Sequence, residues 1–371
     1  MTATPLLPPQ APCLQPLRPL LHPALHPLLH PLHAERLSPE AWLKQAAATR
    51  PPLGGLGWGW PVDGPADGPA DAPGGSGLAA LHTPVLSDAG PWVDAWRSEG
   101  GELATGRSGA VSWQSQGDWA FGQLDIADAD SDLAETARRA YGDVFAALHA
   151  CGRPHVLRLW NYLPRINADG GGLERYRQFN IGRQQAFIDA GRDAFEGAPA
   201  ACALGTTGAQ ADGLAIRFLA GRLPPRPVEN PRQVPAYRYS AVHGPRAPTF
   251  SRAALADAGG GRVLLFISGT ASIVGERSLH PGDVRAQTEE TLRNLQAVLA
   301  AAMAMCSARY TLASLQCTVY VRHAEHAPAV LALWAAAVPG GPAPRCVQAD
   351  ICRAELLVEI EAHAFAPGAL A

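Results

Sequence analysis

The chain has 371 residues and a net charge of −3, which is enough for two domains and lacks the basic excess of a nucleic-acid-binding protein. Its seven cysteines form no CxxC pair and no zinc spacing, and their odd number argues against a disulfide framework, so we expect a reduced, cytoplasmic protein. Lys44 is the only lysine among 30 basic residues. Schiff-base chemistry, which needs a lysine amine, is therefore disfavoured, and we expect neither a cofactor nor a metal.

Residues 1–78 are expected to form a low-complexity extension outside the folded domains. Residues 1–35 are rich in Leu, Pro and His, and proline at this frequency excludes a continuous helix and hence a membrane span. A short helix is predicted over residues 39–48, whereas residues 51–77 have the Gly, Pro, Ala and Asp composition of a linker. We therefore predict that deleting residues 1–78 leaves the activity intact.

The remaining chain predicts two units with the same order of elements, β-α-β-α-β-β. In the first unit the predicted elements are a strand over 110–125, a helix over 132–150, a strand over 155–162, a helix over 173–190, and strands over 201–204 and 213–218. In the second they are a strand over 262–267, a helix over 283–306, a strand over 312–321, a helix over 326–337, and strands over 346–352 and 356–363. This order predicts a duplicated α+β fold with domains over 79–221 and 222–371. A Pro- and Arg-rich connection, residues 221–250, joins the two units, and its length indicates a functional loop.

Two carboxylates in the final predicted strand are the first candidates for chemistry. Glu359 and Glu361 alternate with apolar residues, so they lie side by side on one face of the strand. Like charges at that spacing raise at least one pKa, and burial raises it further, which is what an acid catalyst near neutral pH requires. The alternative is an ordinary solvent-exposed strand face. We also predict that the last two strands form a β-hairpin, which places Arg345 beside these carboxylates.

Four segments combine arginine with aromatic residues: residues 159–167, 172–183 and 237–246, and the start of the tail at Arg345. Guanidinium groups bind carboxylates in a bidentate fashion, and phenols donate hydrogen bonds to ring hydroxyls. For any single arginine the alternative is a surface salt bridge. Their clustering favours a site for a small, partly cyclic ligand with several carboxylates.

Five motifs carry a resemblance to a known family: LRLWNYLPRIN, GLERYRQFNIGRQQAF, YRYSAVHGPRAPTFSRA, FISGTASIVG followed by QTEETLRNL, and CRAELLVEIEA. From about residue 153 to 362 the chain resembles the chorismatases, which cleave chorismate into pyruvate and a ring product. The second half also resembles the Rid/YjgF-type imine deaminases. The resemblance implies duplicated Rid/YjgF-like (chorismate-mutase-like) sheets packed against helices. Residues 1–78 lie outside the resemblance, and their composition predicts a disordered N-terminal extension. The resemblance further implies chorismate as the small-molecule substrate and a monomer or trimer. The charge and the proline content predict no nucleic acid and no membrane partner.

The resemblance also implies roles for individual residues. Glu359 matches the family's catalytic glutamate, which protonates the enol ether of chorismate at its methylene carbon, and Cys352 is the second candidate catalytic residue. The candidate substrate-binding residues are Arg177, Tyr237, Arg246, Arg345, Ala271, Tyr239 and Arg183.

The ring product depends on two of these positions. Family members that form hydroxybenzoate carry a cysteine seven residues before the catalytic glutamate, as Cys352 does here, whereas alanine at the position of Ala271 is typical of hydrolytic members. The favoured product is 3-hydroxybenzoate or 4-hydroxybenzoate, or both. The alternatives are hydrolysis to 3,4-dihydroxycyclohexa-1,5-dienoate, a Rid-like enamine or imine deaminase, and a carboxylate-binding module without turnover.

Overall fold

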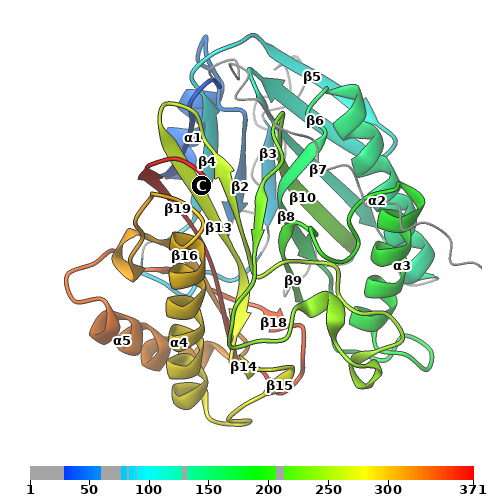
Figure 1. Cartoon of the computed structure of the whole chain (residues 1–371), viewed down its shortest axis with the longest axis vertical. Helices are drawn as coiled ribbons and strands as arrows, with labels where there is room; N and C mark the ends of the chain where they lie inside the picture. The colour runs from blue at the N-terminus through cyan, green and yellow to red at the C-terminus, as the bar shows by residue number, and fades with distance from the viewer. Residues whose placement is uncertain (1–28, 60–76, 82, 89, 128–131, 206–212) are drawn as a thin grey trace, which may run out of the picture.

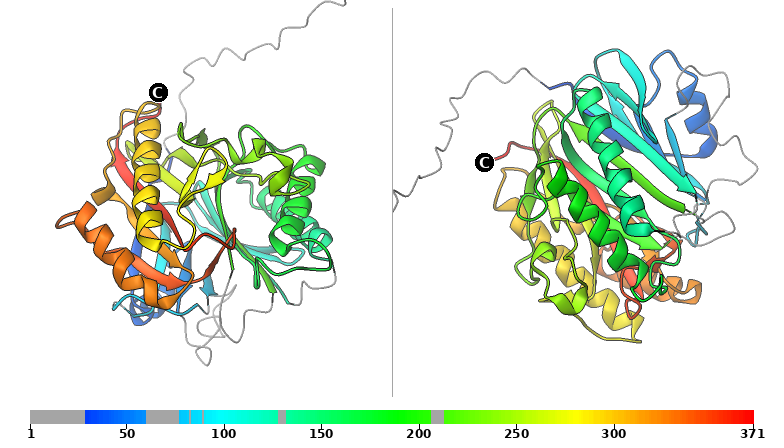
Figure 2. Two further views of the ribbon diagram at one scale, coloured as in Figure 1. Left: turned by 90° about the horizontal axis from the view of Figure 1, so that it is seen from below. Right: turned by 90° about the vertical axis from the view of Figure 1, so that its right-hand side faces the viewer.

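Two large sheets face each other across a buried core, and each carries two helices on its outer side (Figures 1 and 2). The computed structural model describes residues 29–59, 77–81, 83–88, 90–127, 132–205 and 213–371. Within these residues no helix is both long enough and apolar enough to cross a membrane.

The first large sheet has seven strands in the order β18-β9-β8-β10-β7-β6-β5. These strands are β5 (Leu103–Ser108), β6 (Val111–Gln116), β7 (Trp119–Ala127), β8 (His155–Tyr162), β9 (Ala200–Gly205), β10 (Gly213–Gly221) and β18 (Asp350–Ile351). The helices α2 (Leu133–Ala150) and α3 (Arg175–Asp189) cover its outer face. The Asp132 side chain caps α2, and the apolar stripe of Tyr141, Val144 and Leu148 packs onto the sheet.

The second large sheet has six strands in the order β11-β12-β13-β19-β16-β17. These strands are β11 (Arg226–Val228), β12 (Ala253–Asp257), β13 (Arg262–Ala271), β16 (Gln316–Val321), β17 (Arg345–Gln348) and β19 (Val358–Pro367). Its outer face is covered by α4 (Val284–Met303) and α5 (Ala327–Ala337), and the short hairpin of β14 (Ile273–Val274) and β15 (Arg277–Ser278) follows β13. Val358 and Ile360 of β19 belong to the core beneath these helices. The alternate residues of β19 therefore face the other sheet.

The two sheets repeat one topology. The strand order β9-β8-β10-β7-β6 in the first corresponds to β17-β16-β19-β13-β12 in the second. In both, one pair is parallel (β8 with β9, β16 with β17) and the remaining pairs of the repeat are antiparallel. The predicted duplicated α+β fold is therefore confirmed, and the predicted helices are found within a few residues of their expected bounds.

The expectation that the N-terminal segment is unfolded is wrong for the part that the structure describes. A third sheet, in the order β1-β4-β2-β3, contains β1 (Leu32–Leu37), β2 (Gly54–Trp58), β3 (Leu78–Leu81) and β4 (Trp92–Ser98), with α1 (Pro39–Ala46) beside it. Trp42, Leu56 and Trp58 are buried. The glycines of β2 do not mark a linker, because a side chain on Gly54 would overlap the ring of Phe121. Only the short helix of this region was predicted, and residues 1–28 and 60–76 of the expected extension lie outside the described residues.

Two predicted strand arrangements also differ from the structure. The strand expected over residues 110–125 is the hairpin of β6 and β7, which turns at Gly117 with a φ of 58°. The tail does not form a hairpin, because β17 pairs in parallel with β16 and is thereby separated from β19. Between them, β18 crosses to the other large sheet and pairs with β9. Arg345 therefore lies two strands away from the carboxylates.

Candidate active site

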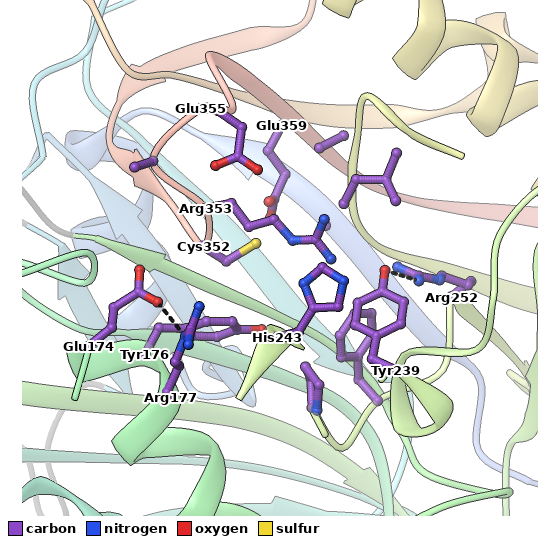
Figure 3. Close-up of a pocket in the computed structure, with 16 residues that line it drawn as sticks. Glu174, Tyr176, Arg177, Tyr239, His243, Arg252, Cys352, Arg353, Glu355 and Glu359 are labelled. Carbon is purple, nitrogen blue, oxygen red and sulfur yellow. Dashed lines mark hydrogen bonds and ion pairs between the residues drawn. The ribbon is translucent and has the colours of Figure 1, made fainter. Parts of the chain in front are cut away.

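A cavity of about 200 Å³ opens where the inner faces of the two large sheets meet α3 and the connection before β12. Figure 3 shows Glu359, Cys352 and Arg353 on one side of it and Tyr176 and Arg177 on the other. Both repeats therefore contribute side chains to the same site.

Glu359 lies on the inner face of β19, opposite Ala271 of β13, and is only 4% exposed. Its carboxyl group occupies the space above Gly269, where any side chain would overlap Oε1. Among the described residues no hydrogen bond to this carboxyl group is found. Burial and, next, the negative charge of Glu361 raise its pKa to about 8, against the opposing effect of Arg158 and Arg252. Glu359 is therefore protonated at neutral pH, and its carboxyl group lines the cavity, where it can donate a proton to a ligand.

Glu361, the other carboxylate of the predicted pair, is also buried, with 6% exposure. It is ion-paired with Arg158 of β8 and accepts a hydrogen bond of 2.6 Å from the Tyr320 hydroxyl of β16. It does not reach the main cavity and lines a smaller internal one. The interpretation of this strand face as solvent-exposed is thus excluded.

Three guanidinium groups, those of Arg177, Arg252 and Arg353, line the cavity. Arg252 donates to the Tyr239 hydroxyl at 2.7 Å, and Arg353 donates to the Glu276 carbonyl at 2.9 Å. Within the described residues, Nε of Arg252 and Nη2 of Arg353 are buried without a hydrogen-bond partner. Buried, unpaired guanidinium N–H groups are costly, and carboxylates are the strongest acceptors for such groups.

Neutral donors complete the wall. Burial and then Glu359 raise the pKa of the Cys352 thiol to about 12, and burial raises the pKa of Tyr176. The pKa of His243 is lowered, first by burial and then by Arg353. The thiol and phenol therefore keep their protons at neutral pH, and the imidazole is uncharged. The thiol, the phenol and the Glu359 carboxyl group can therefore donate hydrogen bonds to a bound anion, while His243, Glu174 and Glu355 are the groups of the lining that can accept a proton.

Five of the candidate residues meet in this cavity: Glu359, Cys352, Ala271, Arg177 and Tyr239. The structure places these five residues around one cavity, and their assignment to a catalytic and substrate-binding site stays a prediction.

Four other candidates lie elsewhere. Arg345 lies on β17 at the far edge of the second large sheet, where its guanidinium carbon is 5.5 Å from the centroid of the Trp92 ring. Arg183 is buried against aromatic rings of α2 and α3, with Tyr141 at 5.3 Å, so it belongs to the helix packing. Arg246 donates to Gln184 at 3.3 Å and does not line the cavity. Tyr237 is buried outside the cavity lining, in the connection between the repeats.

Sequence reasoning missed Tyr176, Arg252 and Arg353 as cavity residues. Each lies within a motif that was singled out: Tyr176 precedes Arg177, Arg353 follows Cys352, and Arg252 is the penultimate residue of the motif that contains Tyr239. The signal was present in the motifs, but the choice among neighbouring arginines depends on how the two repeats meet, which the sequence pattern does not specify.

Comparison with known proteins agrees with this geometry. Residues 94–220 match the family model of the N-terminal domain of FkbO/Hyg5-like chorismatases, and residues 248–366 match that of endoribonuclease L-PSP. A chorismatase of Streptomyces rapamycinicus is 36% identical over 289 residues, covering 76% of this chain and 84% of the relative. The chain belongs to the chorismatase family. A 3-hydroxybenzoate synthase of Streptomyces hygroscopicus is 36% identical over 288 residues, covering 75% of this chain and 82% of that relative. The crystal structure of a chorismatase matches with a TM-score of 0.76 and 29% identity, covering 91% of this chain and 99% of the other.

Proposed function

We propose that this chorismatase-family protein cleaves chorismate to pyruvate and a hydroxybenzoate. The observation that carries the proposal is the protonated, buried Glu359 in a cavity lined by three guanidinium groups. Chorismate is a dianion with an acid-labile enol ether, so it needs both cations for its carboxylates and an acid for its methylene carbon.

The reaction begins when the Glu359 carboxyl group protonates the methylene carbon of the enol ether. Positive charge then develops next to the ether oxygen and is stabilised by ionised Glu359. The guanidinium groups of Arg177, Arg252 and Arg353 hold the carboxylates, and the unpaired N–H groups of Arg252 and Arg353 support this assignment. General acid catalysis of this kind is worth roughly 10²–10⁴-fold in rate.

The ring product follows from what happens to the activated ether. If the ring hydroxyl displaces the side chain, the ring aromatises to 3-hydroxybenzoate or 4-hydroxybenzoate, whereas attack by water leaves the dihydrodiol acid. Cys352 is in the cavity with a protonated thiol, which can orient a ring hydroxyl. This contact and the 3-hydroxybenzoate synthase among the relatives favour the aromatic product.

A Rid-like deaminase is the second candidate, favoured by the match of the second half to endoribonuclease L-PSP. The contribution of α3 to the cavity argues against a deaminase, because Tyr176 and Arg177 come from the other repeat.

The six cysteines of the described residues are free thiols, which supports our further proposal of a reducing, cytoplasmic location.

Incubation with chorismate tests the proposal. Pyruvate is measured by coupling to lactate dehydrogenase, and the ring product is identified by retention time and mass. We expect pyruvate together with an equal amount of hydroxybenzoate. Release of ammonia from an imino acid without any pyruvate from chorismate supports the deaminase instead, and chorismate binding without turnover supports a binding module.

A further inference from the structure

The inner face of β19 carries a row of ionisable side chains, Glu359, Glu361 and His363, that faces the other large sheet. Glu359 lines the cavity proposed for substrate. Glu361 instead lines the smaller internal cavity of about 20 Å³, which is room for about one water molecule. A substrate in the main cavity therefore does not touch Glu361.

Two side chains bind the carboxylate of Glu361. Arg158 donates Nη2 to Oε2, and the Tyr320 hydroxyl donates to Oε1 at 2.6 Å. Burial, and then the charge of Glu361, raise the pKa of Tyr320, so the phenol keeps the proton that it donates. Both carboxylate oxygens thus accept hydrogen bonds from donors that do not take up a proton, which stabilises the charged form.

The ion pair lies deep in the core, where Arg158 is 1% exposed. Taking two charges out of water costs several kcal/mol per ion, so a pair of this kind is weak support for folding stability. The position of the ion pair instead affects the ionisation of Glu359. Glu361 is two residues from Glu359 on the same strand face, a separation of roughly 7 Å, where a fixed negative charge in a dry interior disfavours a second one.

We propose that Glu361 is a positioning residue for the reaction, held as a carboxylate by Arg158 and Tyr320 so that its fixed charge keeps Glu359 protonated between turnovers. This inference rests on the function proposed above for Glu359. The other ionisable groups that interact electrostatically with Glu359 come from five segments: Arg158 of β8, Cys202 of β9, Arg252 before β12, Cys352 after β18 and Tyr176 of α3. The wall of the same cavity also carries Glu174, Arg177, Tyr239, His243, Arg353 and Glu355. The two thiols and the Tyr176 phenol are neutral at neutral pH. Burial is the main cause that opposes ionisation of Glu359, and Glu361 is the charged group that adds to it, whereas Arg158 and Arg252 favour ionisation.

The pH profile of kcat/KM for pyruvate release separates this role from a structural one. An acid that must be protonated gives a rate that falls above its pKa, which is about 8 for Glu359. Glu361→Gln removes the fixed charge and leaves Arg158 unbalanced, so the alkaline midpoint should move down by about one pH unit or more. The variant should be impaired at neutral pH and recover toward wild type near about pH 5. An unmoved midpoint, or an equal loss at every pH, overturns the inference.

Two further variants sharpen the test. Arg158→Met combined with Glu361→Gln removes both charges, so its midpoint should return toward that of wild type, which a mere loss of packing does not produce. Glu290→Gln breaks a comparable ion pair, since Glu290 is 4% exposed and 2.5 Å from Arg232, but it does not line the cavity. It should lower stability and leave the midpoint unchanged.

A titration without substrate distinguishes this inference from the proposed function. In protein carrying ¹³C-labelled glutamate, the carboxyl signal of Glu359 is assigned as the one lost in Glu359→Gln. Its midpoint should lie near 8 in wild type and lower in Glu361→Gln. If this shift is seen but chorismate yields no pyruvate, the proposed function fails and the charge coupling stands. If the midpoint does not move, the coupling is overturned whatever the activity.

Discussion

Glu359 keeps its proton because its carboxyl group is buried between the two large sheets. The carboxyl group fits there because Gly269, which lies against it, has no side chain. Gly269→Ala should leave the fold intact but displace the carboxyl group, because the new Cβ overlaps Oε1. Loss of a correctly placed general acid should lower kcat by at least about 10²-fold.

The matched control is Gly142→Ala in α2, where a Cβ meets no atom within 4 Å. It should leave kcat unchanged and raise the melting temperature slightly, since alanine favours a helix over glycine. Wild-type kcat in Gly269→Ala contradicts the assigned position of Glu359.

Cys352 and Ala271 both line the cavity, so both can influence the ring product. Cys352→Ala should shift the product from hydroxybenzoate toward the dihydrodiol acid, with only a modest fall in pyruvate release because Glu359 still cleaves the ether. Ala271→Gly should shift it the opposite way. Chromatography of the ring products gives the ratio for each variant, and an unchanged ratio in both removes the role of Cys352 in product choice.

The raised pKa of Glu359 also links folding stability to pH. An unfolded glutamate loses its proton around its ordinary pKa of 4.5, whereas Glu359 in the folded protein keeps its proton up to a pH of about 8. Between these two pH values the folded state therefore binds one more proton than the unfolded state. This contribution to stability is therefore complete below pH 4.5 and is lost as the pH rises to about 8. Glu359→Gln cannot ionise, so its free energy of unfolding, measured in urea, should fall less than that of wild type between about pH 5 and about pH 8. Parallel pH dependence in the two proteins contradicts a buried, neutral Glu359.

At the level of elements, hydrophobic periodicity was sufficient where an element packs one face on a sheet. It predicted β8 at its observed bounds and α2 to within one residue. It failed for β2, where Gly54 and Gly55 serve close packing and conceal a strand in a linker-like composition. The tail failed for another reason, since the partner of β17 is set by the crossover of β18 to the opposite sheet.

The N-terminal sheet packs against residues that adjoin the candidate active site. The Trp58 ring contacts Tyr162 and Tyr320 at centroid distances of 5.8 Å, and Tyr320 donates to Glu361. A chain that begins at residue 77 loses the buried Trp42, Leu56 and Trp58 and should aggregate or lose activity, contrary to the expectation from composition. A chain that begins at residue 29 keeps every described strand and is the control. Full activity and an unchanged melting temperature of the chain that begins at residue 77 would contradict a role of the N-terminal sheet in stabilising the site.

At the level of the whole molecule, one duplicated fold creates a site that neither repeat contains alone. The second repeat provides Glu359, Cys352 and Arg353, and the first provides Tyr176 and Arg177. Motifs within each repeat predicted several of these residues. They could not show that Arg345 is absent from the cavity and Arg252 present, because that depends on the docking of two sheets.

The most direct measurement of the central claim is the initial rate of pyruvate release from chorismate by wild type and Glu359→Gln. Glu325→Gln, an exposed glutamate outside the cavity, is the matched control and should behave as wild type. We predict that Glu359→Gln binds chorismate with similar affinity and releases pyruvate at least about 10²-fold more slowly, because an amide cannot donate the proton to carbon. Pyruvate release by Glu359→Gln at a rate near that of wild type would contradict the assignment of Glu359 as the acid.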